Sequence, residues 1–246
     1  MQDLVERAVQ AAKPFVPTAV KRPIKRAVPP RYHRHFDPDW HRRTIGSVPL
    51  WEHLGRLQFD YLVDHGLRPD HHLLDVGCGP LRGGLKFIEY LEPGHYFGVD
   101  KRADVIDESL RTELPRSGLA VRRPTVVAMG DFGFGRLNQT FDYAIAQSVF
   151  THLSLNSIVR CLINMDQVLL PGGQFYATFY ENERGRANLE DVHQTATVTS
   201  HFDSDYYHYD VPSFEWACEG TGLVPEYLGG WDNPYNQKMM VFRKDG

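Results

Sequence analysis

The sequence predicts an α/β fold: a seven-stranded, mostly parallel sheet with an antiparallel C-terminal hairpin and helices on both faces. Three observations predict it. An apolar run ending at Asp75 is followed by a glycine turn and a helical pattern, which gives the order strand, turn, helix. A second strand–loop–helix–strand unit occupies residues 141–180. The segments 223–228 and 238–242 look like two strands without a helix between them, which indicates a hairpin at the sheet edge.

The composition is typical of one globular domain without a disulfide framework. The 246 residues are 42% hydrophobic, which is enough for one core and a small appendage. The three cysteines are sparse and odd in number, which indicates a reducing compartment. No stretch has the length of a membrane span, and the N-terminus lacks the apolar run of a signal peptide. We therefore expect a cytoplasmic protein.

Residues 1–40 are predicted to be a basic, proline-broken arm that precedes a domain at 41–246. Residues 1–43 hold ten Lys or Arg and four Asp or Glu, a balance of +6 within a net charge of −4. Prolines interrupt the short amphipathic pattern of residues 2–12. The arm is interpreted as peripheral and partly ordered. It could pack on the domain, on a second subunit in a homodimer, or on an anionic surface.

The other elements follow from periodicity, in chain order. Apolar residues at helical spacing predict a helix over 50–63, ahead of the first strand. Further helical patterns lie at 103–110, 155–169 and 212–219, the second of them closed by Pro-Gly-Gly at 171–173. Short apolar runs predict strands at 96–100, 125–129, 141–147 and 174–180.

The glycine turn is the centre of the predicted site. Residues 72–84 read HLLDVGCGPLRGG. Glycines let the backbone approach a ligand closely, and the following helix directs its first N–H groups at that ligand. A dinucleotide fingerprint requires glycine where this chain has Arg82. Asp75 would repel a pyrophosphate, so the pattern favours a ligand with a positively charged ammonium group.

This stretch resembles motif I of the class I S-adenosylmethionine-dependent methyltransferases, which have a Rossmann-like fold. The resemblance continues through the acid after the second strand, the end of the fourth strand and the closing hairpin, over about residues 43–243. It implies S-adenosyl-L-methionine as cofactor and transfer of its methyl group to a nucleophile. The residues expected in the cofactor pocket are Asp75, Gly77, Cys78, Gly79, Arg82, Asp100, Asp131, Phe132 and Gln147.

Two acids of this pocket have an alternative structural interpretation. Asp100 ends the second strand, 21 residues after Gly79, where an acid can accept both ribose hydroxyls. It could instead cap the helix that follows. Asp131 and Phe132 stand where the resembled family contacts the adenine, although Asp131 could be a plain turn residue.

A general base is expected beyond the carboxyl ends of the strands, where open α/β sheets carry out their chemistry. His152 follows the fourth strand, and an imidazole with an ordinary pKa of ~6.5 suits a base at neutral pH. The alternative is a histidine packed at a helix start. Glu181, at the end of the fifth strand, is the rival base or an orienting partner. The candidates for contact with the acceptor, or for the core, are Tyr207, His208, Tyr209 and Trp231.

The acceptor is predicted to be a hydroxyl of a sugar or oligosaccharide. The runs 81–84 and 148–153 resemble bacterial O-methyltransferases of sugars and polysaccharides, such as the methylmannose-polysaccharide enzymes. Base amino-methyltransferases carry an Asn- or Asp-Pro-Pro-aromatic run where this chain has Gln-Ser-Val-Phe at 147–150, so nucleic acid is not expected. No Asp/Asp/Asn metal signature is visible, and a Mg²⁺ requirement is left open. The alternatives are a small-molecule or protein acceptor and a non-catalytic cofactor-binding scaffold.

Overall fold

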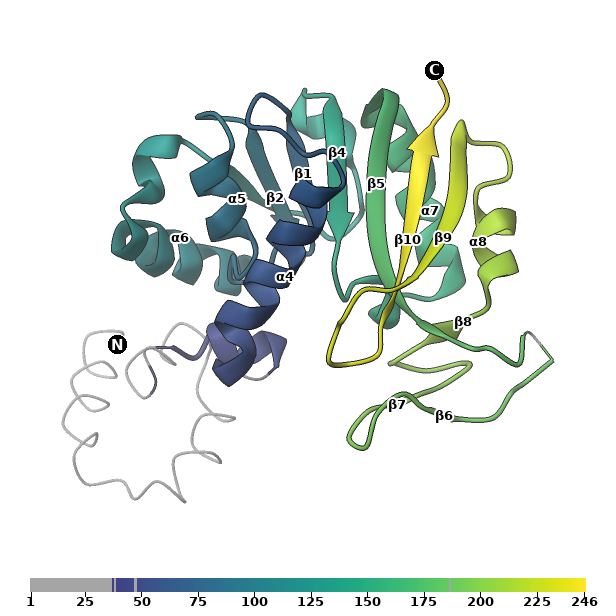
Figure 1. Ribbon diagram of the computed structural model, residues 1–246. Helices are drawn as coiled ribbons and strands as arrows, with labels where there is room; N and C mark the ends of the chain where they lie inside the picture. Colours follow the sequence, from purple (N-terminus) through teal and green to yellow (C-terminus); the bar gives the residue numbers. More distant parts are fainter. Residues whose placement is uncertain (1–36, 38, 47, 186) are drawn as a thin grey trace, which may run out of the picture.

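The computed structural model describes residues 37, 39–46, 48–185 and 187–246, and its centre is a single twisted sheet (Figure 1). The strands of this sheet are β1 (Leu73–Val76), β2 (Tyr96–Asp100), β3 (Thr125–Ala128), β4 (Phe141–Ala146), β5 (Leu169–Glu181), β8 (His208–Tyr209), β9 (Leu223–Gly230) and β10 (Lys238–Lys244). Their order is β3-β2-β1-β4-β5-β10-β9, with β8 paired to β5. A separate two-stranded ribbon joins β6 (Val192–His193) to β7 (Thr199–Ser200).

The expected strand directions are confirmed. β1 pairs parallel with β2 and β4, and β3 and β5 continue the parallel set outward. β10 is antiparallel to both β5 and β9, which is the predicted C-terminal hairpin. Strand β8 adds two residues to the end of β5 that periodicity could not reveal.

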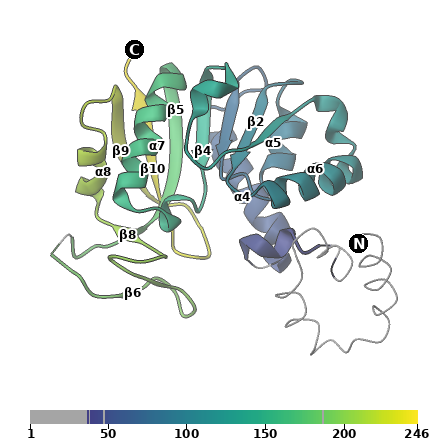
Figure 2. The same ribbon diagram turned by 180° about the vertical axis from the view of Figure 1, so that it is seen from behind.

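Helices cover both faces of the sheet. The α-helices are α4 (Trp51–Asp64), α5 (Gly84–Tyr90), α6 (Ala103–Ser117), α7 (Leu155–Val168) and α8 (Val211–Ala217). Short 3₁₀ segments are η3 (Arg42–Ile45), η4 (Val48–Leu50), η5 (Leu119–Arg122), η6 (Phe134–Leu137) and η7 (Phe150–His152). Helices α4 and α5 lie on the face seen in Figure 1, and α7 and α8 lie on the face seen from behind in Figure 2.

Alternate strand residues build two cores, because successive side chains of a strand point to opposite faces. Leu74 and Phe175 belong to the cluster that includes the buried residues of α7 and α8. Leu73 and Tyr176 belong to the cluster on the side of α4 and α5. This burial on both faces explains why the central strands read as continuous apolar runs rather than as alternating patterns.

The Pro-Gly-Gly turn differs from the expectation. Helix α7 ends at Val168, and β5 begins at the next residue, so residues 171–173 lie inside the strand rather than before it. The pairing of β4 with β5 shifts register between Phe141 and Tyr143, opposite this segment. Gly172 has a positive φ of 77°, a conformation that suits glycine and interrupts regular pairing.

The predicted N-terminal arm lies outside the described residues except for residues 37, 39 and 40. Of these, Asp37 and Trp40 are buried, so packing against the domain already begins before residue 41. Within the part of the chain that the structure describes, no helix combines the length and apolar character needed to cross a membrane.

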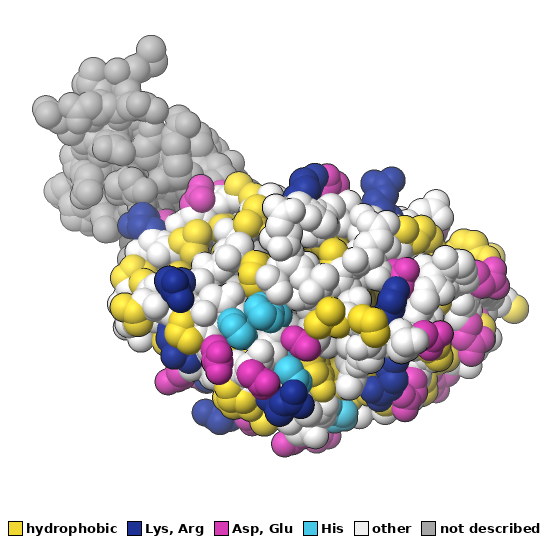
Figure 3. All heavy atoms as spheres, turned by 90° about the horizontal axis from the view of Figure 1, so that it is seen from above, with side chains coloured by type: hydrophobic (Ala, Val, Ile, Leu, Met, Phe, Trp, Pro, Cys, Tyr) yellow, Lys and Arg dark blue, Asp and Glu magenta, His cyan; other side chains and the backbone are white. Residues whose placement is uncertain are grey.

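The two edges of the sheet have different characters. The carboxyl ends of the parallel strands lie at the lower edge in Figure 1, together with η3, the β9–β10 loop and the segment from β6 to β8. Figure 3 looks onto the opposite edge, where histidines gather beside acidic side chains. There His72 stacks on His95 with ring centroids 4.0 Å apart, and its backbone N–H donates to Asp142. These contacts join the starts of neighbouring strands. Open α/β sheets bind their ligands beyond the carboxyl ends of the strands, so the candidate site is described at that edge.

Candidate active site

The glycine turn after β1 has the backbone conformation that its sequence predicts. Gly77 and Gly79 have φ values of 73° and 51°, in the left-handed region that favours glycine. The backbone N–H groups of Gly77 and Cys78 both donate to Val99 O, at 2.7 and 3.0 Å. A Cβ on Gly77 would lie 2.4 Å from a methyl carbon of Val149, so the loop after β4 leaves room only for glycine.

Asp100 fixes the same turn from the end of β2. Its Oδ2 accepts the Gly79 N–H at 3.0 Å, and its Oδ1 accepts the Arg102 N–H at 2.8 Å. Helix α6 has Arg102, not Asp100, at its N-cap position. Each carboxylate oxygen can accept a further hydrogen bond. Asp100 is half-buried beside the turn. Its two carboxylate oxygens can therefore still accept hydrogen bonds from the two hydroxyls of a ligand diol.

Asp75 is buried beneath the turn. Asp75 is 5% exposed, and its Oδ2 accepts a hydrogen bond from the Tyr96 hydroxyl at 2.7 Å. Burial raises the pKa of this carboxyl to about 7, because desolvation disfavours the charged form. A cationic group nearby would favour the carboxylate, so this acid is suited to an ammonium ligand.

Arg82 is the buried cation of the site. Its Nη2 donates to Gln147 Oε1 at 2.8 Å and its Nη1 to Ile45 O at 3.4 Å, while Nε has no partner among the described residues. Burial lowers the pKa of Arg82 to about 10, which leaves it charged at neutral pH. Its side-chain hydrogen bonds go to neutral oxygens, and the carboxyl of Asp75 attracts it only through space. An anionic ligand group would complete its surroundings.

Gln147, directly after β4, is the centre of a polar network. Its Oε1 accepts from Gln58 of α4 at 2.9 Å as well as from Arg82, and its Nε2 donates to Ser148 Oγ at 2.7 Å. Ser148 Oγ in turn donates to Oε1 of Gln237, the residue directly before β10, at 2.9 Å. The network therefore runs from Arg82, in the segment after β1, to Gln237, beside β10. Nothing local in the sequence marks Gln58 or Gln237 as its members.

Asp131 and Phe132 follow β3, as predicted, but the carboxylate already has a partner. Asp131 forms an exposed ion pair with Arg136 at 2.5 Å, and this hydrogen bond lowers the pKa of Asp131 to about 2. The ring of Phe132 meets Phe134 edge-on, with centroids 6.1 Å apart. Contact of these two residues with an adenine stays a prediction.

His152 ends η7, beyond the end of β4, where the sequence predicts a base. Its Nδ1 lies 2.8 Å from Asp205 Oδ1, and its ring lies 4.8 Å from that of Tyr206. The side chain is 41% exposed, and Nε2 has no partner in the described part of the chain. An imidazole whose Nδ1–H is held by a carboxylate presents Nε2 as a proton acceptor.

Asp205 reaches His152 through a long insertion between β5 and α8. Strand β8 returns to the end of β5, where His208 pairs with Tyr180. Next to it, the Tyr207 N–H donates to Thr151 O at 2.7 Å. The insertion is therefore attached both to β5 and to the loop that carries His152. The sequence contains no signal that would connect two residues 53 positions apart.

Glu181 lies elsewhere on the edge. Its Oε2 accepts the hydroxyl of Tyr227, on β9, at 2.6 Å, and it raises the pKa of that tyrosine after the larger effect of burial. The contacts recorded for His152 are with Asp205 and Tyr206 instead. A catalytic role for Glu181 stays a prediction, and its described contact with Tyr227 does not add support for it.

The four predicted acceptor contacts occupy mainly interior positions. Tyr209 is buried, and its hydroxyl donates to Leu153 O at 2.5 Å. The other three are a Tyr207 ring stacked on Tyr209, a buried His208 with Nδ1 3.1 Å from Ser200 Oγ, and a buried Trp231 packed on Tyr61. Their contact with an acceptor stays a prediction. Tyr206, by contrast, is exposed.

Comparison with known proteins shows which family and which folds this chain resembles. Residues 74–175 match the sequence model of a methyltransferase domain family. Geranyl diphosphate 2-C-methyltransferase of Saccharopolyspora erythraea is 32% identical over 74 residues, and this match spans about a quarter of each chain, 24% of both.

Solved structures extend the likeness to the whole fold. Magnesium protoporphyrin IX methyltransferase of Synechocystis, solved with bound S-adenosylmethionine, has a TM-score of 0.59 at 14% identity, over 88% of this chain and 95% of that one. An S-adenosylmethionine-dependent methyltransferase of Clostridium acetobutylicum has a TM-score of 0.58 at 13% identity, over 85% and 96%. At such identities the likeness concerns the fold.

The fold is thus the Rossmann-like fold of class I methyltransferases. Residues 74–175 are similar to a methyltransferase domain, and structures that share this fold were solved with bound S-adenosylmethionine or S-adenosylhomocysteine. The site fits this cofactor, because it combines a glycine turn, a buried acid, a buried guanidinium whose Nε has no hydrogen-bond partner among the described residues, and a second acid at the tip of β2. Among the described residues, no group of His, Cys, Asp or Glu is arranged to hold a metal ion.

Proposed function

We propose that this protein transfers the methyl group of S-adenosyl-L-methionine to a hydroxyl of a sugar or oligosaccharide, with His152 as general base. The observation that carries the proposal is the His152–Asp205 pair at the carboxyl edge, with Nδ1 and Oδ1 2.8 Å apart and Nε2 unpartnered among the described residues. A hydroxyl is a poor nucleophile while protonated, and this pair can accept its proton.

The cofactor is proposed to lie between the turn after β1 and the end of β4. Asp100 would accept from its ribose hydroxyls, as acids at this position do in related folds. Asp75 and Arg82 would hold its ammonium and carboxylate groups, since they are the buried acid and the buried cation of the site. When bound, the cofactor supplies an electrophilic methyl group on a sulfonium.

The acceptor is proposed to lie against the other end of the Gln147 network, near His152. His152 Nε2 would take the hydroxyl proton as the oxygen forms its bond to the methyl carbon and the bond from that carbon to sulfur breaks, which leaves S-adenosylhomocysteine. Asp205 would stabilise the imidazolium that results. Tyr206 supports a ring-shaped acceptor, because it is 40% exposed and its ring adjoins that of His152. Aromatic rings of this kind stack on sugar faces.

A small-molecule acceptor of another class is the second candidate. It is favoured by the sequence match to a geranyl diphosphate methyltransferase, a match that spans 24% of that enzyme. That relative methylates carbon, as its name says. A histidine–aspartate pair can also take the proton of a hydroxyl acceptor, so the pair by itself does not decide between the two acceptors. The alternative of a cofactor-binding scaffold has no support from the edge, which keeps an accessible base.

The deciding experiment is a methyl-transfer screen with radiolabelled cofactor. The panels are mannose-containing oligosaccharides, small alcohols with isoprenyl diphosphates, and protein extract, each run with the parent chain and with His152→Ala. Label in the oligosaccharide panel that is lost in the variant supports the proposal. Label confined to another panel contradicts the sugar acceptor. Binding of S-adenosylhomocysteine without transfer in any panel contradicts the catalytic function.

A further inference from the structure

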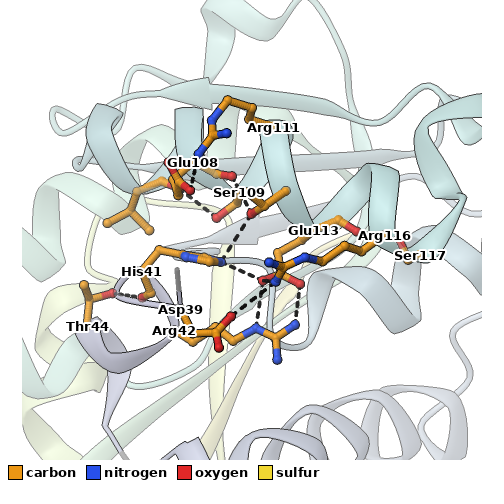
Figure 4. Close-up of polar contacts among 12 residues, drawn as sticks. Asp39, His41, Arg42, Thr44, Glu108, Ser109, Arg111, Glu113, Arg116 and Ser117 are labelled. Atoms are coloured by element: carbon orange, nitrogen blue, oxygen red, sulfur yellow. Dashed lines mark hydrogen bonds and ion pairs between the residues drawn. The ribbon is translucent and has the colours of Figure 1, made fainter. Parts of the chain in front are cut away.

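A buried carboxylate on α6 anchors the segment that precedes helix α4. Glu113 is 1% exposed, and its Oε1 lies 2.6 Å from His41 Nε2 and 2.7 Å from Arg42 Nε. Its Oε2 accepts from Arg42 Nη2 at 2.7 Å. Figure 4 shows both side chains converging on this one carboxylate from across the domain surface. Hydrogen bonds from His41 and Arg42 outweigh burial and lower the pKa of Glu113 to about 2.

The anchored segment, residues 41–46, is called here the strap. Its far end lies over the cofactor turn. Ile45 Cγ2 is 3.3 Å from the point where a Cβ on Gly79 would stand, and Asp100 Oδ2 is 3.9 Å from the same point. The Ile45 carbonyl accepts from the guanidinium of Arg82 at 3.4 Å. The strap therefore lies against two residues assigned to the cofactor pocket, Gly79 and Arg82.

Polar contacts of the strap itself add to the burial of Trp40, directly before it, in holding its anchored end. None of the four residues of η3 is buried, and η3 has no side-chain cap. The described contacts at this end include the bonds of His41 and Arg42 to Glu113, a contact of Thr112 Oγ1 with His41 Nε2 at 3.5 Å, and a cation–π contact of Arg42 with Trp51, 4.8 Å from the ring centroid. Removal of the carboxylate would leave His41 buried without its partner and Arg42 without its bidentate acceptor.

We propose that Glu113 is a positioning residue for cofactor binding: by fixing the strap, it keeps Ile45 over Gly79 and the Ile45 carbonyl on Arg82. This inference rests on the cofactor pocket of the proposed function. Glu113 itself does not reach that pocket, so its effect passes through the strap. A cofactor bound beneath Ile45 leaves more slowly when the strap is anchored, because the strap must move before the pocket opens.

The same helix supplies a matched control. Glu108 is also buried and also pairs with an arginine, Arg111, three residues further along α6. Its recorded side-chain contact stays within the helix and does not involve the strap. Glu108→Gln and Glu113→Gln therefore remove the same charge from the same element, and only the second change releases the strap.

The test measures the affinity and dissociation rate of S-adenosylhomocysteine by calorimetry and stopped flow, with hydrogen exchange of residues 42–46 in the same samples. Glu113→Gln should weaken binding about 10-fold or more, within the usual range of coupling between linked elements. Most of the loss should appear as faster dissociation, with faster exchange in the strap. Glu108→Gln should bind like the parent chain.

A structural role alone would lower thermal stability without changing the affinity of the folded protein. Parent-like affinity of Glu113→Gln, with or without faster exchange, overturns the inference. If that variant does not fold, Ile45→Ala should weaken binding while leaving the Glu113 contacts in place, and parent-like affinity there overturns the inference equally. Failure of the parent chain to bind S-adenosylhomocysteine overturns the proposed function and this inference together.

Discussion

The turn after β1 and the loop after β4 carry the two halves of the proposed chemistry, and the chain holds them differently. The β1 turn is buried, and its acid and its cation, Asp75 and Arg82, lie within eight residues of each other. The β4 loop presents a half-exposed His152 whose partner, Asp205, comes from 53 residues away. The difference teaches that the binding half is built by local sequence and the acceptor half by tertiary contacts.

The largest expected effect concerns the acceptor half. His152→Ala should lower turnover about 10²–10⁴-fold, because a general base in the transition state contributes that much. The affinity for S-adenosylhomocysteine should stay at the parental value, since the histidine is outside the cofactor pocket. Steady-state kinetics on the acceptor found in the screen, paired with calorimetry, separates the two. Near-parental turnover would make His152 structural and would leave Glu181 as the next candidate.

A smaller loss is expected when the base is kept but released from its partner. Asp205→Asn should lower turnover by about 10²-fold, the cost typical of a misplaced catalytic group. The same kinetic assay measures it, and Asp203→Asn, in the same loop, is the control. An Asp205→Asn variant as active as the parent would mean that His152 acts without this orientation.

The binding half should respond in affinity rather than in turnover. Asp100→Ala should weaken S-adenosylmethionine binding by about 1.5–3 kcal/mol, the value of lost hydrogen bonds to a charged group. Part of the loss would come from the Gly79 turn, whose N–H donates to the same carboxylate. Calorimetry measures the change directly. Unchanged affinity would remove Asp100 from the pocket.

The smallest effect is a dependence of cofactor affinity on pH. Free Asp75 has a pKa of about 7, and an ammonium group nearby would lower it, so binding releases a proton. Affinity for S-adenosylhomocysteine should therefore rise about 10-fold between pH 6 and pH 8 and then level off. Calorimetry across this range should show the rise in the parent chain and a flat profile in Asp75→Asn. A parent profile that is flat or falls with pH would contradict the role of Asp75.

The predicted parts of the fold are those with a local cause. The glycines of the β1 turn, the acid at the tip of β2 and the closing hairpin follow from short patterns, and the structure has all of them. The loop that carries His152 was predicted for the same reason, since a strand, a loop and a helix follow one another there.

The rest depends on contacts between distant segments. Asp205, Gln237 and Glu113 become partners of the site only because β8, β10 and α6 bring them there. The same applies to Tyr209, for which the sequence leaves acceptor contact and the core equally open. The pairing of β8 with β5 directs its side chain into the core, and a two-residue strand has no periodicity that could reveal this.

The most direct test of the account is a crystal structure of the protein with S-adenosylhomocysteine. The account predicts that the ribose hydroxyls contact Asp100, that the amino-acid end lies between Asp75 and Arg82, and that the sulfur faces the opening bordered by His152. A ligand bound in this pocket with its sulfur turned away from His152 would contradict the proposed base. A ligand bound away from the β1 turn would contradict the whole arrangement.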